Sequence, residues 1–206
     1  MKENSLYQTC QRKVEKDGEK YMKQLKMLRY SAPVRERKLP DGWSYVLFGG
    51  SEAEVADWIE ICKNGLLGPH IDKESFAKYI LRWRDLVPEK DLFFVVNAEG
   101  RRVATTAYVQ YADGTGYLHC VGSLPETRGC GVGHAMLAHA LEMGEERKTP
   151  YTILTTDDFR LAAIKTYLDA GFLPVLYHDP DSDMKARWDK VLAELHYRQV
   201  EYLKEE

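Results

Sequence analysis

The chain has 206 residues, of which 44% are hydrophobic and 30% charged, and this size suits one domain with extensions around a substantial core. No apolar run approaches the roughly 20 residues that a membrane helix needs, and the N-terminus lacks the apolar segment of a secretory signal, so we expect no membrane partner. The four cysteines are dispersed, which argues against a disulfide framework or a metal site and favours a cytoplasmic protein with reduced thiols.

The first forty residues are basic, with eleven Lys or Arg against five Asp or Glu, whereas the rest of the chain is acidic. Apolar residues at helical spacing, among them Leu25 and Leu28, predict one or two amphipathic helices over residues 6–29. The cations are spread along the helix rather than clustered, which argues against a nucleic-acid partner. We expect this extension, residues 1–38, to pack on the domain or on a partner such as the second chain of a homodimer.

Residues 39–178 show alternating strand and helix patterns that predict one domain. Ser51 and Glu54 form a capping box that begins a helix, and Asp158 is expected to cap a later one. Continuous apolar or alternating runs separated by turn residues predict three antiparallel strands in the middle of the domain. The expected strands are 43–48, 92–96, 103–110, 115–123, 151–155 and 172–177, and the expected helices are 51–62, 73–84, 132–147 and 159–171.

This order predicts an α/β (α+β) fold with a mixed, mostly antiparallel central sheet of six or seven strands flanked by helices. Residues 179–182 are expected to cap a closing helix whose buried stripe contains Met184, Trp188 and Val191. We expect this C-terminal segment, residues 179–206, to pack on the domain.

A glycine-rich turn follows the third strand of the middle group and opens a helix. Such a turn brings backbone N–H groups together at the positive end of a helix dipole, where phosphate binds well. The spacing fits neither a G-x-G-x-x-G fingerprint, because His134 occupies the third glycine position, nor a Walker loop, because no Gly-Lys-Ser/Thr is present. It fits R-x-x-G-x-G, here Arg128, Gly131 and Gly133.

A second motif lies on the predicted helix downstream, where Arg160, Ala163, Tyr167, Gly171 and Phe172 form R-x-x-A-x-x-x-Y-x-x-x-G-F. Ala163 and Tyr167 are four residues apart and therefore share a helix face. The tyrosine is either a phenol that faces a ligand groove or a core aromatic that closes the helix.

The two motifs, with their separation and the order of elements, resemble the GNAT acyltransferase superfamily over about residues 42–177. The resemblance implies that acetyl-CoA binds with its pyrophosphate on the glycine loop and that Tyr167 protonates the departing CoA thiolate. It also implies direct transfer of the acetyl group to an amine in a ternary complex, without a metal. The residues implied in binding acetyl-CoA are Ser123, Leu124, Arg128, Gly129, Cys130, Gly131, Val132, Gly133, Arg160 and Ala163.

Two of these residues keep more than one interpretation. Arg128 either neutralises phosphate charge or braces the loop. Arg160 stands where the family usually has an asparagine that holds the pantetheine arm, so it reaches a phosphate, turns to solvent or pairs with the adjacent Asp157.

A base is needed because an amine with a lysine-like pKa near 10.4 arrives protonated. His119 is expected to share one strand face with Tyr117, Val121 and Ser123, and a histidine titrates near neutral pH. Glu126, Asp157 and a water-mediated base are alternatives.

The leading hypothesis is an acetyl-CoA-dependent N-acetyltransferase that acts on a small amine, a lysine side chain or an N-terminal amine. The alternative is a non-catalytic acyl-CoA sensor or interaction module, against which the retained Tyr167 argues. A covalent acyl-enzyme on Cys130 is disfavoured, because His134 nearby has no evident group to orient it.

Overall fold

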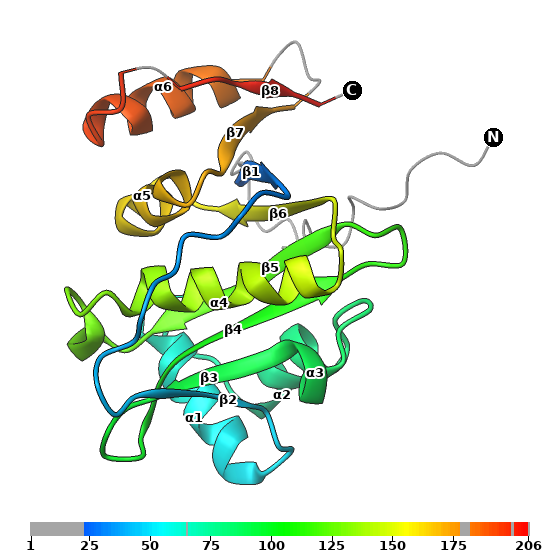
Figure 1. Cartoon of the computed structure of the whole chain (residues 1–206), viewed down its shortest axis with the longest axis vertical. Helices are drawn as coiled ribbons and strands as arrows, with labels where there is room; N and C mark the ends of the chain where they lie inside the picture. The colour runs from blue at the N-terminus through cyan, green and yellow to red at the C-terminus, as the bar shows by residue number, and fades with distance from the viewer. Residues whose placement is uncertain (1–22, 65, 178–181, 199, 206) are drawn as a thin grey trace.

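The computed structural model describes residues 23–64, 66–177, 182–198 and 200–205. Eight strands form one sheet in the spatial order β2-β3-β4-β5-β6-β1-β7-β8 (Figure 1). The strands are β1 (Leu25–Tyr30), β2 (Ser44–Leu47), β3 (Leu92–Val96), β4 (Arg102–Gln110), β5 (Gly116–Ser123), β6 (Tyr151–Thr156), β7 (Leu173–Leu176) and β8 (Leu203–Lys204). All neighbours are antiparallel except β5 with β6 and β7 with β8, which confirms the predicted mixed, mostly antiparallel sheet.

Helices cover both faces of this sheet (Figure 1). Helix α4 packs on the face that carries Tyr108, whose hydroxyl lies beside Gly144 of α4 and hydrogen-bonds Thr152 at 2.9 Å. Helix α1 packs on the opposite face, where Ile61 approaches Gly122 of β5. The helices are α1 (Glu52–Lys63), α2 (Lys73–Phe76), a π-helical turn η1 (Ala77–Leu81), α3 (Pro88–Asp91), a 3₁₀ turn η2 (Pro125–Thr127), α4 (Val132–Glu146), α5 (Leu161–Asp169) and α6 (Met184–Glu194).

Strand β1 corrects the sequence prediction for the end of the basic N-terminal segment. Residues 25–30 form a strand between β6 and β7 instead of a helix, while residues 6–22 of the predicted helix lie outside the described ranges. Leu25 and Met27 are fully buried, and the strand has a hydrogen-bonded neighbour on each side. A strand buried on both faces has no period-2 pattern, so the three-residue spacing of Leu25 and Leu28 imitated a helix.

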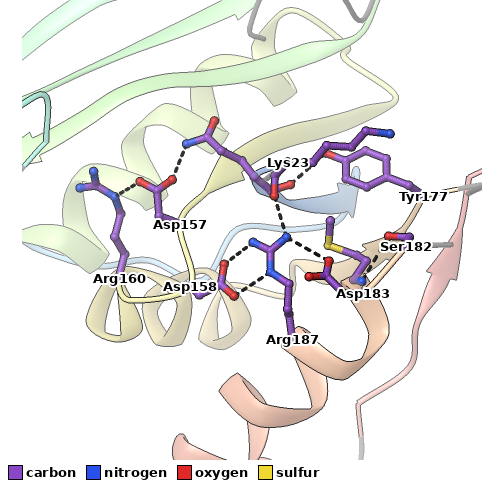
Figure 2. A network of polar contacts seen from close by, with 10 residues as sticks. Lys23, Asp157, Asp158, Arg160, Tyr177, Ser182, Asp183 and Arg187 are labelled. Atoms are coloured by element: carbon purple, nitrogen blue, oxygen red, sulfur yellow. Dashed lines mark hydrogen bonds and ion pairs between the residues drawn. The ribbon is translucent and has the colours of Figure 1, made fainter. Parts of the chain in front are cut away.

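Local capping explains where two helices begin. The predicted capping box of α1 is confirmed, since Ser51 accepts from the Glu54 N–H and the Glu54 carboxylate accepts from the Ser51 N–H. Asp158, however, does not cap α5, which begins after Arg160 without a side-chain cap. Its carboxylate instead accepts hydrogen bonds from Arg187 of α6 (Figure 2).

The closing helix α6 buries Met184, Trp188 and Val191, which confirms the predicted stripe. Of the residues expected to cap it, 179–181 lie outside the described ranges, and the Ser182 hydroxyl accepts from the Met184 N–H. Strand β8, next to β7, was not expected from the sequence. Among the residues that the structure describes, no helix combines the length and apolarity needed to cross a membrane.

The sheet splits between β5 and β6. These parallel strands pair only at Gly116 with Thr152 and at Tyr117 with Ile153. Beyond these two pairs, β5 runs on to Ser123 and β6 to Thr156 without pairing each other. The diverging ends leave a wedge between residues 118–123 and 154–156, and the glycine loop and α5 follow directly from its two walls.

We predict that Gly144→Ala destabilises the fold by about 1–3 kcal/mol, the usual cost of overpacking a core. An added Cβ would overlap the Tyr108 hydroxyl and lie 2.6 Å from its Cζ, and that ring is held by the Thr152 hydrogen bond. Urea unfolding measures the change. Gly133→Ala is the matched control in the same helix, because nothing lies within 4 Å of its added Cβ; equal stability of the two variants would contradict the prediction.

Candidate active site

The first wall of the wedge is the end of β5, which contains a β-bulge. Ala107 of β4 pairs with His119 and Thr105 with Gly122, so one extra residue is accommodated on β5. Cys120 takes a φ of 52° there, in the left-handed region that a side chain seldom adopts. Such strain persists only where the surroundings impose it, and it is often found at functional sites.

The bulge changes which side chains share a face. A Cβ on Gly122 would meet Leu66 and Ile61, on the side of α1, and His119 also faces the helices on that side. The predicted alternation, with Tyr117, His119, Val121 and Ser123 all on one face, is therefore wrong beyond Cys120, because the extra residue shifts the alternation by one position.

The glycine loop leads from β5 through η2 into α4. Gly129 and Gly131 have φ values of 78° and 76°, and nothing lies within 4 Å of a Cβ built on Gly129, Gly131 or Gly133. Only glycine adopts this backbone without strain, and the open space in front of the three residues is a cradle that side chains would fill.

Backbone donors converge on this cradle, at the positive end of a 15-residue helix with no acidic residue in its first turn. Within the described ranges, five N–H groups here donate no hydrogen bond: those of Gly129, Gly131, Val132, Gly133 and His134. The cradle thus fits a phosphate or pyrophosphate. The Cys130 N–H does not contribute, since it donates to the Thr127 carbonyl at 3.2 Å.

Three other residues of this segment, Leu124, Arg128 and Cys130, were predicted to bind acetyl-CoA, and they differ in whether their polar groups are free to bind a ligand. The Leu124 N–H donates to Val103, and its carbonyl accepts from both the N–H and the hydroxyl of Thr127, so its backbone is already engaged in the protein. The exposed Arg128 side chain forms no hydrogen bond or ion pair with a described residue, which favours a role toward a ligand over bracing. The Cys130 thiol is exposed, 3.8 Å from the Arg128 carbonyl, and the nearby His134 imidazole contacts Asp169 instead.

Helix α5, which follows the second wall β6, carries Tyr167 and, one turn earlier, the partly buried Ala163. Tyr167 is 6% exposed and packs edge-on against Phe172, with 6.0 Å between the ring centroids. Burial raises the pKa of its hydroxyl to about 12, and the Arg160 guanidinium opposes this shift. Tyr167 therefore holds its proton at neutral pH. Its hydroxyl bonds to no other described residue, which leaves it available as a donor.

Arg160, just before α5, connects two segments. Its Nε donates to Asp157 at 2.8 Å (Figure 2). Its Nη2 donates to the carbonyl of Leu66, in the loop after α1, at 2.8 Å. The sequence left three interpretations of Arg160 open. The structure shows one of them, the ion pair with Asp157. The guanidinium is fixed near Tyr167 and links α5 to the loop on the far side of the sheet.

A chain of polar contacts crosses the base of the wedge. The Tyr117 hydroxyl contacts the Thr155 hydroxyl at 3.0 Å, Thr155 donates to the Gln24 amide at 3.0 Å, and that amide donates to Asp157 at 2.9 Å. The sequence did not indicate Gln24 or Thr155. The sequence predicted a helix at Gln24. The role of Thr155 depends on its position beside the split between β5 and β6, which the sequence pattern does not show.

His119 is packed in an aromatic cluster. It stacks on Trp83 with 3.8 Å between the ring centroids, and its Nε2 lies 2.8 Å from the Tyr79 carbonyl and 3.3 Å from the Cys120 sulfur. Because a carbonyl only accepts, Nε2 carries the proton. Burial lowers the pKa of His119 to about 4, although the hydrogen bond to Tyr79 raises it. The imidazole is thus neutral, with the nitrogen that contacts Tyr79 already protonated.

Two further aromatic residues on this side of the sheet belong to the core. Trp58 and Phe76 are buried and pack edge-on, with 5.2 Å between the ring centroids.

We predict that His119 makes stability depend on pH. The unfolded imidazole titrates near 6.5 and the folded one near 4, so only the unfolded state gains a proton between these values. Stability from His119 is present above pH 6.5 and is lost as the pH falls toward 4. Relative to His119→Phe, the wild type should lose about 2 kcal/mol of unfolding free energy between pH 7 and 5. Urea unfolding at both pH values tests this, and a parallel response of the two proteins would refute it.

Comparison with known proteins gives this geometry a context. A family model described as the acetyltransferase (GNAT) family matches residues 53–172. Over 156 residues the chain is 26% identical to a mycothiol acetyltransferase from Thermomonospora curvata, which covers 72% of this chain and 52% of that protein.

Solved structures show the same fold. A GCN5-related N-acetyltransferase from Sphaerobacter thermophilus aligns with a TM-score of 0.61 at 21% identity, over 75% of this chain and 50% of that one. The ribosomal-protein-S18-alanine N-acetyltransferase from Escherichia coli aligns with a TM-score of 0.51 at 18% identity, over 63% of this chain and 76% of that one. The chain spans about half the length of the mycothiol acetyltransferase and of the Sphaerobacter protein.

Proposed function

The chain belongs to the acetyltransferase (GNAT) family, and on that premise we propose that it transfers an acetyl group from acetyl-CoA to an amine. The observation that carries this proposal is the juxtaposition at the split in the sheet. An anion cradle with five unused N–H groups follows one strand, and a buried, protonated tyrosine with a free hydroxyl lies on the helix after the other.

The cradle suits the donor molecule. The N–H groups of Gly129, Gly131 and Gly133 would bind the pyrophosphate, with Arg128 available to neutralise its charge. The wedge between β5 and β6 would receive the pantetheine arm, whose amides can pair with an open strand edge such as that at Ser123. Ala163 on α5 leaves room for the arm. Acetyl-CoA supplies a thioester that an amine attacks directly.

Tyr167 then acts as the general acid. As the amine nitrogen bonds to the carbonyl carbon and the carbon–sulfur bond breaks, its hydroxyl donates a proton to the sulfur. Arg160 lies close enough to oppose the burial-induced rise in the pKa of Tyr167, so it also stabilises the negative charge that develops on oxygen or sulfur. No covalent intermediate is required, and the Cys130 thiol has no base beside it.

The attacking amine must lose protons to a base, and we assign this role to Asp157, acting directly or through water. His119 presents a protonated nitrogen to the Tyr79 carbonyl and has a pKa of about 4, so we place it in the structural support of the wall. Glu126 pairs with Arg101 at an exposed position, 2.7 Å apart. Asp157 follows the end of β6, at the mouth of the wedge, and its two oxygens are oriented by Gln24 and Arg160.

The acceptor is an amine of a small molecule, a lysine side chain or a protein N-terminus. The similar proteins include a mycothiol acetyltransferase and a ribosomal-protein-S18-alanine N-acetyltransferase, so family membership leaves this choice open. The acidic remainder of the chain favours encounter with cationic amines.

We predict that Tyr167→Phe lowers kcat by about 10²–10⁴-fold, the usual contribution of general acid catalysis, and leaves the Kd for CoA unchanged. Release of free CoA thiol is followed over a panel of polyamines, aminoglycosides, lysine peptides and peptides with a free N-terminus. Calorimetry measures CoA binding.

Two results would contradict the proposal. If the folded wild type does not bind acetyl-CoA, the donor assignment is wrong. If it binds acetyl-CoA, turns over no amine and is indifferent to Tyr167→Phe, it is a sensor rather than an enzyme.

Asp157→Asn should lower kcat/KM by about 10²–10⁴-fold, because an amide cannot take the proton of the attacking amine. The amide oxygen can replace only one of the two carboxylate oxygens that accept from Gln24 and Arg160, so circular dichroism checks the fold of the variant. Glu126→Gln is the matched control, because it neutralises a carboxylate outside the wedge, and it should leave kcat/KM unchanged. A folded Asp157→Asn enzyme with the wild-type kcat/KM would exclude Asp157 as the base.

A further inference from the structure

A second basic site lies beside the cradle. Residues 29–37 lead from β1 across α4 toward β2, and with the first turns of α4 and the end of α5 they enclose a pocket of about 100 Å³, here called the strap pocket. Figure 1 shows this strap crossing in front of α4. The polar side chains that line the pocket are Arg29, Arg35, Arg37, His134 and Asp169.

Arg29 brings a buried positive charge to the strap pocket. It is 8% exposed, and its Nε donates to the Ala170 carbonyl at 2.9 Å while its Nη2 donates to the Ala32 carbonyl at 2.7 Å. These acceptors are neutral, and no carboxylate of the described residues forms an ion pair with Arg29. Burial lowers its pKa, and the Glu145 carboxylate, which forms no ion pair with Arg29, opposes this shift from a distance. An anion in the pocket would add a negative charge in direct contact with the guanidinium.

Arg35 and Arg37 add two charges at the mouth of the pocket. Both are exposed, and neither forms an ion pair with a described residue, whereas the intervening Glu36 pairs with Lys38 at 3.6 Å. Asp169, the one carboxylate among the described residues of the lining, already accepts from Lys165 at 2.8 Å and from the Tyr197 hydroxyl. Three arginines therefore face a single carboxylate whose charge is already matched.

His134 joins the strap pocket to the cradle. Its backbone N–H is one of the five unused donors, and its imidazole lines the pocket, 3.4 Å from Asp169. A ligand that fills both sites must carry two anionic groups a short distance apart. CoA does so, because its 3′-phosphate lies one ribose away from its pyrophosphate.

We propose that the strap pocket binds the 3′-phosphate of CoA, with Arg35 and Arg37 as the residues that recognise it. This inference rests on the proposed function, since it assumes that the pyrophosphate occupies the cradle. A phosphomonoester carries a charge of about −1.5 to −2 at neutral pH, and the guanidinium fork matches its oxygens. The strap thereby makes the protein select CoA thioesters over 3′-dephospho-CoA thioesters.

The test compares CoA with 3′-dephospho-CoA by calorimetry on the full chain at constant ionic strength. The wild type should bind 3′-dephospho-CoA about 10- to 100-fold more weakly, as expected for the loss of charge-assisted hydrogen bonds. In Arg35→Ala/Arg37→Ala the two ligands should bind with nearly equal affinity, because CoA loses what the 3′-phosphate contributed. Both arginines are exposed, so the variant should fold like the wild type, which circular dichroism checks.

Arg37→Ala and Lys38→Ala form a matched pair, since each removes one cation from the same strap and only Arg37 lines the pocket. Arg37→Ala should reduce the preference for CoA, and Lys38→Ala should retain it. Equal binding of both ligands to the wild type, or an unchanged preference in the double variant, would overturn the inference alone. A wild type that binds neither ligand would overturn the proposed function and this inference with it.

Discussion

The split between β5 and β6 is the constraint on which the rest of this molecule depends. Two parallel strands that pair over only two residues and then diverge leave backbone groups along both walls without a partner strand. The chain reaches α4 from β5 through η2 and the glycine loop, and it reaches α5 from β6 through residues 157–160, so a helix follows each wall. In the function that we propose, the loop, the helix and the wedge form one site, in which the extended arm of acetyl-CoA would complete the sheet while its pyrophosphate meets the amino end of α4.

Strand β1 and its strap support this opening from the other side. β1 pairs with both β6 and β7, and so holds the wall formed by β6 from the side away from β5. The residue before it, Gln24, takes part in the polar chain to Asp157, while Arg29 within it binds the end of α5 and the strap. One short segment thus positions the second wall, orients the proposed base and encloses the second basic pocket.

Burial acts on the two titratable residues of the site in the same physical way and with different results. In each case the low-dielectric surroundings disfavour the charged form. For Tyr167 this keeps the proton on a hydroxyl that can donate it, whereas for His119 it keeps the ring neutral and, with the Tyr79 carbonyl, occupies its Nε2. Desolvation therefore favours Tyr167 as a general acid and disfavours His119 as a general base. For this reason we propose the more exposed Asp157 as the base.

The sequence by itself determined the features that depend on local spacing. The order of elements, the capping box at Ser51 and the left-handed glycines of the cradle all follow from neighbouring residues, and the predicted fold class was confirmed. Only the tertiary structure decided what depends on distant neighbours. β1 became a strand because β6 and β7 flank it, and the bulge at Cys120 changed the face of β5. The pKa of His119 is lowered because the ring is buried against Trp83 and Tyr79, which are far away in the sequence. The spacing of residues along the chain does not indicate such burial.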